Sequence, residues 1–274
     1  MVKCSDYSPD SVAAAKSVLV ELVHLLAQYR DGIVLVGGWV PYLLLPQGAE
    51  AHVGSLDIDL ALDHHVLQEA GYQTIRALLL KRGYREGDQP FIFYREVPTP
   101  GEPLTVEVDL LAGEYQGTGK GHRTQPVQDV RARKARGCDL VFDAPVEIIV
   151  AAPLPDGGRD TITIRVASLV PFMVMKGMAL HSRLKSKDAY DIYFCVRNYS
   201  DGVAALAEQF RPHMQHSLVR EGLRYIANAF ASPADVGPTW VADFQEVTEQ
   251  EGRELLLRDA YERVTEWLQQ LDVS

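Results

Sequence analysis

Two segments of the chain alternate apolar and acidic residues in the same way, and this pattern constrains the fold more than any other feature. They read Leu56-Asp57-Ile58-Asp59-Leu60 and Val106-Glu107-Val108-Asp109-Leu110. Because side chains alternate between the two faces of a strand, each segment predicts a strand with one apolar face and two carboxylates on the other. If the two strands are neighbours in one sheet, three or four carboxylates converge on one cleft.

Such a group of negatively charged side chains needs positive charge close by. Carboxylates two residues apart on a strand lie about 7 Å apart and repel each other unless a positive charge lies between them. A divalent cation is the usual solution, and hard oxygen ligands suit Mg²⁺ or Mn²⁺. The pattern therefore indicates a site for Mg²⁺ or Mn²⁺, and the alternative is an acidic face exposed to solvent without a ligand.

A glycine pair follows an apolar strand earlier in the chain. Residues 33–36 read Ile-Val-Leu-Val and predict a short buried strand, which Gly37 and Gly38 end. Glycine lets backbone N–H groups approach a phosphate closely, and the start of a following helix favours an anion. Taken alone, the same pair is equally typical of a simple tight turn.

The remaining pattern predicts an α+β protein with a mixed sheet flanked by helices and a helical C-terminal region. A change of composition near residue 167 predicts two domains, 1–167 and 168–274. We expect a mobile loop over 112–137 and helical structure after Ser168. The other expected elements are helices over 9–29 and 66–82, and strands over 33–36, 56–62, 91–97, 104–111, 138–142, 146–151 and 160–166.

Composition excludes several classes of protein. The net charge of −10 over 274 residues excludes a protein that coats nucleic acid non-specifically. One basic cluster stands out, and it is either a phosphate or RNA clamp or a solvated loop. Its members are Lys120, His122, Arg123, Arg131, Arg133, Lys134 and Arg136. Three distant cysteines fit neither a disulfide framework nor a zinc cluster, and no apolar run spans a bilayer, so we expect a cytoplasmic location without membrane contact.

The glycine pair and the acidic strands together resemble the signature of the nucleotidyltransferase superfamily with the DNA polymerase beta-like core. The matching segments are Val36-Gly37-Gly38-Trp39, Ser55-Leu56-Asp57-Ile58-Asp59-Leu60 and Val108-Asp109-Leu110. The resemblance implies that Gly37, Gly38 and Ser55 contact the nucleotide. It also implies that Asp57 and Asp59 are catalytic metal ligands and that Asp109 is the third, although alternation alone leaves Glu107 as a rival.

A second block is similar to the AbiEii/AbiGii-type abortive-infection nucleotidyltransferases, many of which are toxins of toxin–antitoxin pairs. It runs from Met175-Lys176-Gly177 through Arg183 and Lys185 to Lys187-Asp188-Ala189-Tyr190-Asp191. The resemblance implies nucleotide contacts by Lys176, Arg183, Lys185, Asp188 and Asp191, whereas the plain interpretation is a charged helical face with solvated ion pairs. Many members carry an arginine shortly before the Asp-x-Asp, where this chain has His52-Val53-Gly54.

The resemblance implies an enzyme that moves a nucleoside monophosphate from a nucleoside triphosphate to a hydroxyl group. We expect tRNA or a protein as the acceptor, Mg²⁺ or Mn²⁺ as the cofactor and an antitoxin protein as a partner. Two alternatives stay open. One is an enzyme that modifies a small molecule, like the aminoglycoside and lincosamide nucleotidyltransferases, and the other is a non-catalytic nucleotide-binding module.

Overall fold

The computed structural model describes residues 2–48, 50–68, 71, 73–99, 101–114, 123–183 and 185–273. They confirm the expected α+β class and form two compact units. The sheet unit comprises Ser8–Val40 and Gly54–Ser168. The helical unit comprises Met1–Tyr7, Pro41–Val53 and Leu169–Ser274. The expected division of the chain into domains 1–167 and 168–274 stays a prediction.

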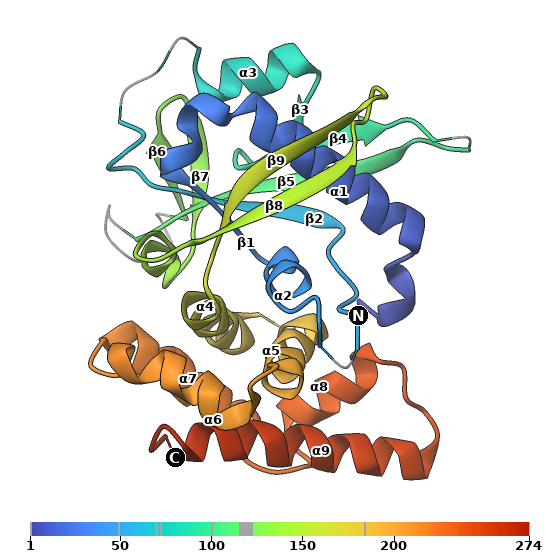
Figure 1. Cartoon of the computed structure of the whole chain (residues 1–274), viewed down its shortest axis with the longest axis vertical. Helices are drawn as coiled ribbons and strands as arrows, with labels where there is room; N and C mark the ends of the chain where they lie inside the picture. The colour runs from blue at the N-terminus through green and yellow to red at the C-terminus, as the bar shows by residue number, and fades with distance from the viewer. Residues whose placement is uncertain are drawn as a thin grey trace. The chain divides into compact units, whose positions relative to one another are not determined.

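A mixed sheet forms the centre of the sheet unit (Figure 1). Its strands follow in the order β3 (Arg85–Glu86), β4 (Ile92–Val97), β5 (Leu104–Ala112), β2 (Asp57–Leu62), β1 (Ile33–Val36), β9 (Arg159–Val166) and β8 (Val146–Pro153). A hairpin of β6 (Thr124–Val127) and β7 (Val130–Lys134) joins the sheet where β7 pairs with β5. The two acidic strands, β2 and β5, are direct parallel neighbours.

Helix α1 (Pro9–Leu25) lies across one face of this sheet (Figure 1). The Ser8 hydroxyl caps it by accepting a hydrogen bond of 3.1 Å from the backbone N–H of Ser11. The helix is shorter than the expected 9–29 because the chain tightens into the 3₁₀ turn η2 (Ala27–Gly32). Apolar side chains of α1, among them Val18 and Leu22, are fully buried.

Three expected elements of this unit are wrong within the described residues. The helix expected over 66–82 begins only at Ile75, as α3 (Ile75–Arg82), because the Thr74 hydroxyl caps it there. The loop expected over 112–137 contains β6 and β7, and the strand pattern of β7 is hidden because Val130 and Ala132, which are buried, alternate with arginines. Residues 138–142 form the 3₁₀ helix η3 (Cys138–Phe142) rather than a strand.

The helical unit confirms the expected helical C-terminal region. It contains α4 (Leu169–Ser182), α5 (Ser186–Asn198), α6 (Gly202–Phe210), α7 (Ser217–Ala229), α8 (Val236–Phe244), α9 (Gln250–Gln269) and the 3₁₀ turns η1 (Cys4–Asp6) and η4 (Arg211–His213). Helices α4 and α7 cross closely, since a Cβ on Gly177 would lie 2.3 Å from the carbonyl oxygen of Gly222. Among the described residues, no helix is both long and apolar enough to cross a membrane.

Candidate active site

The carboxylates of β2 and β5 stand side by side on one face of the sheet. The parallel register places Asp57 opposite Glu107 and Asp59 opposite Asp109. In-register neighbours project from the same face. The intervening apolar residues project from the other face, where Ile58 is fully buried. The structure thus brings together all four acidic residues that the sequence pattern singles out.

Asp109 is the most buried of the four, with 8% of its surface exposed. The Arg133 Nη2 atom of β7 donates a hydrogen bond of 2.6 Å to its Oδ2 atom, whereas its buried Oδ1 atom has no partner. Burial raises the pKa of Asp109, and the charges of Glu107 and Asp57 raise it further, although Arg133 opposes them. Asp109 therefore has one buried oxygen that accepts no hydrogen bond.

The position of Asp57 is fixed by two residues that precede β2 in the chain. The buried Ser55 hydroxyl donates a hydrogen bond of 2.5 Å to Asp57 Oδ1. The fully buried Trp39, directly after the glycine pair, donates from Nε1 to the carbonyl oxygen of Asp57 at 2.9 Å. Trp39 thereby ties the glycine turn to the start of the acidic strand. It also begins α2 (Trp39–Leu44).

Gly37 lies directly against Asp59. Its backbone has a φ of +72°, and a Cβ at this position would lie 2.0 Å from Asp59 Oδ2. The turn is closed by a hydrogen bond of 3.2 Å from the Val40 N–H to the Gly37 carbonyl. No side chain other than hydrogen fits this turn without moving the carboxylate. The phosphate contacts expected of Gly37 and Gly38 stay predictions.

We expect Gly37→Ala to destabilise the protein more than a glycine replacement that meets no neighbour. Gly157 is the matched control, because its φ of +92° imposes the same backbone strain while a Cβ there would touch nothing within 4 Å. Both variants should lose about 1–2 kcal/mol of unfolding free energy to backbone strain. Gly37→Ala should lose about 1–3 kcal/mol more, because Asp59 must move. Urea denaturation measures both, and equal losses would contradict the close packing against Asp59.

The donor chemistry of this face fits a hard divalent cation. It offers the oxygens of four carboxylates, one of which is buried without a hydrogen-bond partner. Among the described residues, no three His, Cys, Asp or Glu side chains are arranged so that they could hold an ion. Mg²⁺ in proteins is usually bound through one or two carboxylates together with water and the phosphates of the substrate.

The second sequence block forms a buried charge cluster within the helical unit. Lys176 Nζ on α4 lies 2.7 Å from Asp188 Oδ1 and 2.7 Å from Asp191 Oδ2 on α5, although the second contact is an ion pair without hydrogen-bond geometry. Arg183 adds two hydrogen bonds of 2.8 and 2.9 Å to Asp188. Asp188 and Asp191 are buried, so the interpretation as solvated ion pairs is wrong. Lys185, in contrast, is exposed.

Burial and charge act in opposite directions on this cluster. Burial alone would lower the pKa of Lys176, but Asp188 and Asp191 raise it above its ordinary value. Burial likewise would raise the pKa of Asp191, but Lys176 and Lys187 lower it strongly. All these groups are therefore charged near neutral pH, and each depends on its partners because an unpaired charge is costly when buried.

His52, within the departure from the family pattern, proves to be part of the same cluster. Its buried Nε2 atom lies 3.0 Å from Asp191 Oδ1. Burial, reinforced by the charge of Lys187, lowers the pKa of His52 to about 4 although Asp191 opposes the shift. The ring is therefore neutral and donates its Nε2 proton to the carboxylate.

This shift predicts that acidification destabilises the protein through His52. In the unfolded chain the ring binds a proton near pH 6.5, whereas the folded protein resists protonation down to about pH 4. Because of this difference in the pKa of His52, the unfolding free energy should fall by about 2 kcal/mol between pH 7 and pH 5. His52→Gln keeps a donor for Asp191 but does not titrate. Urea denaturation at both pH values should show a smaller loss for this variant, and equal losses would contradict the assignment.

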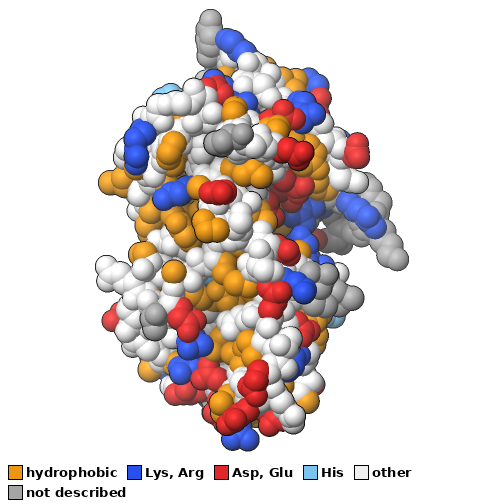
Figure 2. All heavy atoms as spheres, turned by 90° about the vertical axis from the view of Figure 1, so that its right-hand side faces the viewer, with side chains coloured by type: hydrophobic (Ala, Val, Ile, Leu, Met, Phe, Trp, Pro, Cys, Tyr) orange, Lys and Arg blue, Asp and Glu red, His pale blue; other side chains and the backbone are white. Residues whose placement is uncertain are grey.

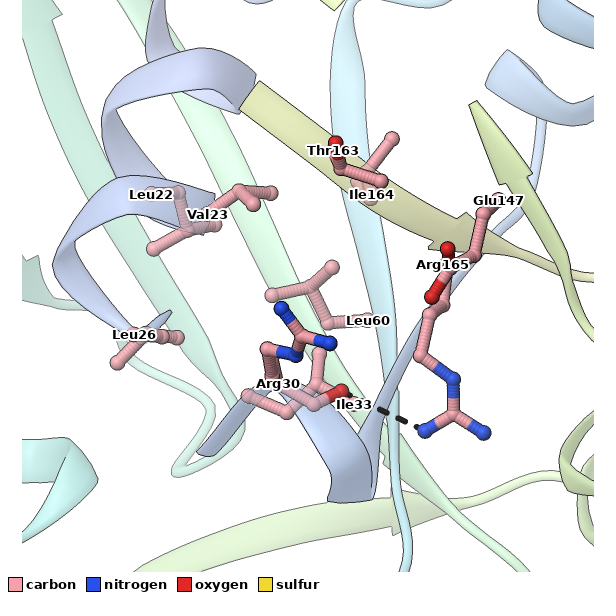
Figure 3. Close-up of a pocket in the computed structure, with 10 residues that line it drawn as sticks. All are labelled: Leu22, Val23, Leu26, Arg30, Ile33, Leu60, Glu147, Thr163, Ile164 and Arg165. Atoms are coloured by element: carbon pink, nitrogen blue, oxygen red, sulfur yellow. Dashed lines mark hydrogen bonds between the residues drawn. The ribbon is translucent and has the colours of Figure 1, made fainter. Parts of the chain in front are cut away.

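A separate apolar hollow lies on the opposite face of the sheet from the carboxylates. Figure 3 shows Leu22 and Val23 of α1, with Leu26 directly after that helix, on one side of it and residues of β9 on the other. Leu60 lines it, and side chains alternate along β2, so Asp57 and Asp59 point away from it. Its rim carries Arg30, Glu147 and Arg165 but no group of converging carboxylates, and we do not assign the candidate site to it.

The described residues of the basic cluster have different surroundings. Arg133 pairs with Asp109, Arg136 pairs with Glu114 at 3.0 Å, and Arg131 is exposed. Lys120 and His122 lie outside the described residues. On the face drawn in Figure 2, the described Lys and Arg side chains are scattered among Asp and Glu rather than gathered in one broad basic area. An RNA clamp at this cluster stays a prediction.

A comparison with protein families agrees with this arrangement. A model described as "Nucleotidyl transferase AbiEii toxin, Type IV TA system" matches residues 22–269. The chain belongs to the AbiEii family. Membership confirms the resemblance drawn from the two motif blocks and identifies the chain as a nucleotidyltransferase of a toxin family. A search of curated proteins found no match.

The sequence of this AbiEii-family chain did not reveal the partners of Arg133, Tyr94 and His52. Arg133 appears in the sequence only as one of several basic residues, and its pairing with Asp109 depends on the register of β7 against β5. Tyr94 lies opposite Glu107 on β4, and the charge of Glu107 raises the pKa of its hydroxyl. His52 could have been suspected from its place before the acidic strand, but its partner Asp191 is 139 residues away.

Proposed function

We propose that this AbiEii-family chain transfers a nucleoside monophosphate from a nucleoside triphosphate to a hydroxyl acceptor in a reaction that needs Mg²⁺ or Mn²⁺. The observation that carries the proposal is the in-register placement of Asp57 and Asp59 beside Glu107 and Asp109, with Gly37 against Asp59. The face offers carboxylate oxygens as ligands, and the turn beside it has no room for a side chain larger than hydrogen at position 37. It suits a cation that arrives together with phosphates.

Each group on this face has a part in the proposed reaction. Asp57 and Asp59 hold the metal, and Asp109 completes the site in preference to Glu107, because Asp109 has a buried oxygen without a partner. When bound, the metal ion activates the attacking hydroxyl and offsets the charge of the leaving pyrophosphate. The acceptor oxygen bonds to the α-phosphorus, the bond from that phosphorus to the β-phosphate oxygen breaks, and the Asp109 carboxylate takes the hydroxyl proton.

The proposed nucleotide contacts are Gly37, Gly38, Ser55, Lys176, Arg183, Lys185, Asp188 and Asp191. Two aspartates offset the charge of Lys176, so Lys176 supplies charge to a phosphate only in partnership with them. The exposed Lys185 carries no such constraint.

The family description names a toxin–antitoxin system but no acceptor. We propose tRNA or a protein as the acceptor and an antitoxin protein as the partner that controls the enzyme in the cytoplasm. The description of the family as a type IV toxin–antitoxin system supports the partner.

Transfer of a labelled nucleotide tests this function. The purified protein is incubated with each α-³²P nucleoside triphosphate, total cell extract and Mg²⁺ or Mn²⁺, and the products are treated separately with ribonuclease and protease. Label should appear in one macromolecular product, disappear with EDTA, and be absent when the triphosphate is labelled at the γ-phosphate. Transfer of the γ label, or transfer that ignores EDTA, would contradict the proposal.

A further inference from the structure

Among the described ion pairs of arginine, the pair between Arg133 and Asp109 stands out because a buried atom on each side has no hydrogen-bond partner. We propose that Arg133 is a positioning residue that competes with the metal ion for Asp109 and is released to a phosphate when the metal and the triphosphate bind together. This inference rests on the proposed function, because it concerns the same carboxylate face.

The register of the sheet holds Arg133 next to the third carboxylate. Strand β7 pairs in parallel with β5, and Arg133 lies opposite Leu111, two residues beyond Asp109. Side chains two residues apart share a face, so Arg133 projects from the same face as the carboxylates. Its Nη2 atom lies 2.6 Å from Asp109 Oδ2, with 32% of the Arg133 side chain exposed. The guanidinium therefore has access to solvent beside the acidic face.

The pair leaves hydrogen-bonding capacity unused on both sides. Arginine and carboxylate groups commonly pair through two parallel hydrogen bonds. Arg183 does so with Asp188 at 2.8 and 2.9 Å, and Arg76 does so with Glu86 at 2.8 and 2.9 Å. Arg133 gives Asp109 a single hydrogen bond, while Asp109 Oδ1 and Arg133 Nε are both buried without a partner.

Unpaired buried polar atoms are rare in folded proteins and often mark the place of an absent ion or ligand. The open oxygen of Asp109 is a free ligand position on the acidic face. The unused donors of Arg133 match the oxygens of a phosphate, which arginine binds well. A cation on Oδ1 would share the carboxylate with the guanidinium on Oδ2, so each positive charge weakens the binding of the other to Asp109. A phosphate that takes up the guanidinium relieves this competition. Binding of the metal and of the triphosphate should therefore be cooperative.

Binding of Mn²⁺ to the full-length protein without nucleotide tests the competition. Electron paramagnetic resonance measures free Mn²⁺ during the titration. Arg133→Gln should bind Mn²⁺ about tenfold more tightly than the unaltered protein, because the hydrogen-bonded charge that holds Asp109 is gone. A variant that is merely misfolded would lose affinity rather than gain it. Arg131→Gln is the matched control, because it removes the same charge from an exposed position of the same strand and should leave the affinity almost unchanged.

The same comparison in a protein that already carries Asp109→Asn shows whether the tighter Mn²⁺ binding depends on Asp109. In Asp109→Asn the further change Arg133→Gln should no longer tighten Mn²⁺ binding. An equal affinity of Arg133→Gln and the unaltered protein, or an equal gain in Arg131→Gln, would overturn the competition. If Mn²⁺ still binds the unaltered protein and both single arginine variants when a non-hydrolysable triphosphate is present, the proposed function survives that result. Failure of the unaltered protein to bind Mn²⁺ even with the triphosphate would overturn both.

Discussion

Asp57→Asn should reduce nucleotidyl transfer about 10³-fold while leaving the protein at least as stable as before. The rate falls because the variant loses one of the charges that hold the metal, and 10³-fold corresponds to about 4 kcal/mol of activation free energy. Stability does not fall because Asn keeps an oxygen for the Ser55 hydroxyl and removes a like charge opposite Glu107. Relief of that repulsion should add up to about 1 kcal/mol.

Initial rates of pyrophosphate release and urea denaturation of the same preparation measure the two effects. Glu102→Gln is the control, because it removes an equal charge from an exposed residue of the sheet unit that lies outside the strands. It should retain the rate of the unaltered protein. Full activity of Asp57→Asn would refute the role of the acidic strand in the reaction. A large loss of unfolding free energy would refute the interpretation that Asp57 and Glu107 repel each other in the folded protein.

Lys176→Met should cost about 2–3 kcal/mol of unfolding free energy, the loss expected when a contact to a buried charged group is removed. It removes the cation that contacts both Asp188 and Asp191, so that Asp188 keeps Arg183 and Asp191 keeps Lys187 and His52. The apolar stem of methionine retains most of the packing of lysine, so the effect reports on the charge.

Lys185→Met is the matched substitution for this experiment. The Lys185 side chain is exposed at the start of α5, and its loss should change the unfolding free energy by less than about 0.5 kcal/mol. Urea denaturation at pH 7 distinguishes the two variants. A loss below 1 kcal/mol for Lys176→Met would mean that the cluster is not the buried, mutually dependent network that the distances indicate.

The two carboxylates that share a face on each acidic strand were predictable because local rules decide which side chains share a face, whereas the pairing of the two strands with each other is not local. Alternation along 56–62 and 104–110 specifies which side chains share a face, and an apolar core face leaves little freedom in register. The strand and turn around Gly37 are equally local, since the pair of glycines ends an apolar strand that the structure places at Ile33–Val36. For these elements the periodicity and the structure agree.

The partners of the site were not predictable, because they depend on contacts between distant segments. Arg133 reaches Asp109 through a strand whose alternating arginines resemble a loop, and His52 reaches Asp191 across 139 residues. Burial also changed the interpretation of the Lys176 block: a charged helical pattern predicts an exposed face, whereas here Lys176 and Arg183 are matched by buried carboxylates. Sequence periodicity carries no information on such pairing.

The central claim is that the β2 carboxylates bind a divalent ion together with the triphosphate. Calorimetric titration of Mn²⁺ into the full-length protein saturated with a non-hydrolysable triphosphate tests it most directly, compared with the double variant Asp57→Asn, Asp59→Asn. The account predicts a saturable binding site in the unaltered protein and its loss in the double variant. Binding of equal affinity and stoichiometry in both proteins would contradict it.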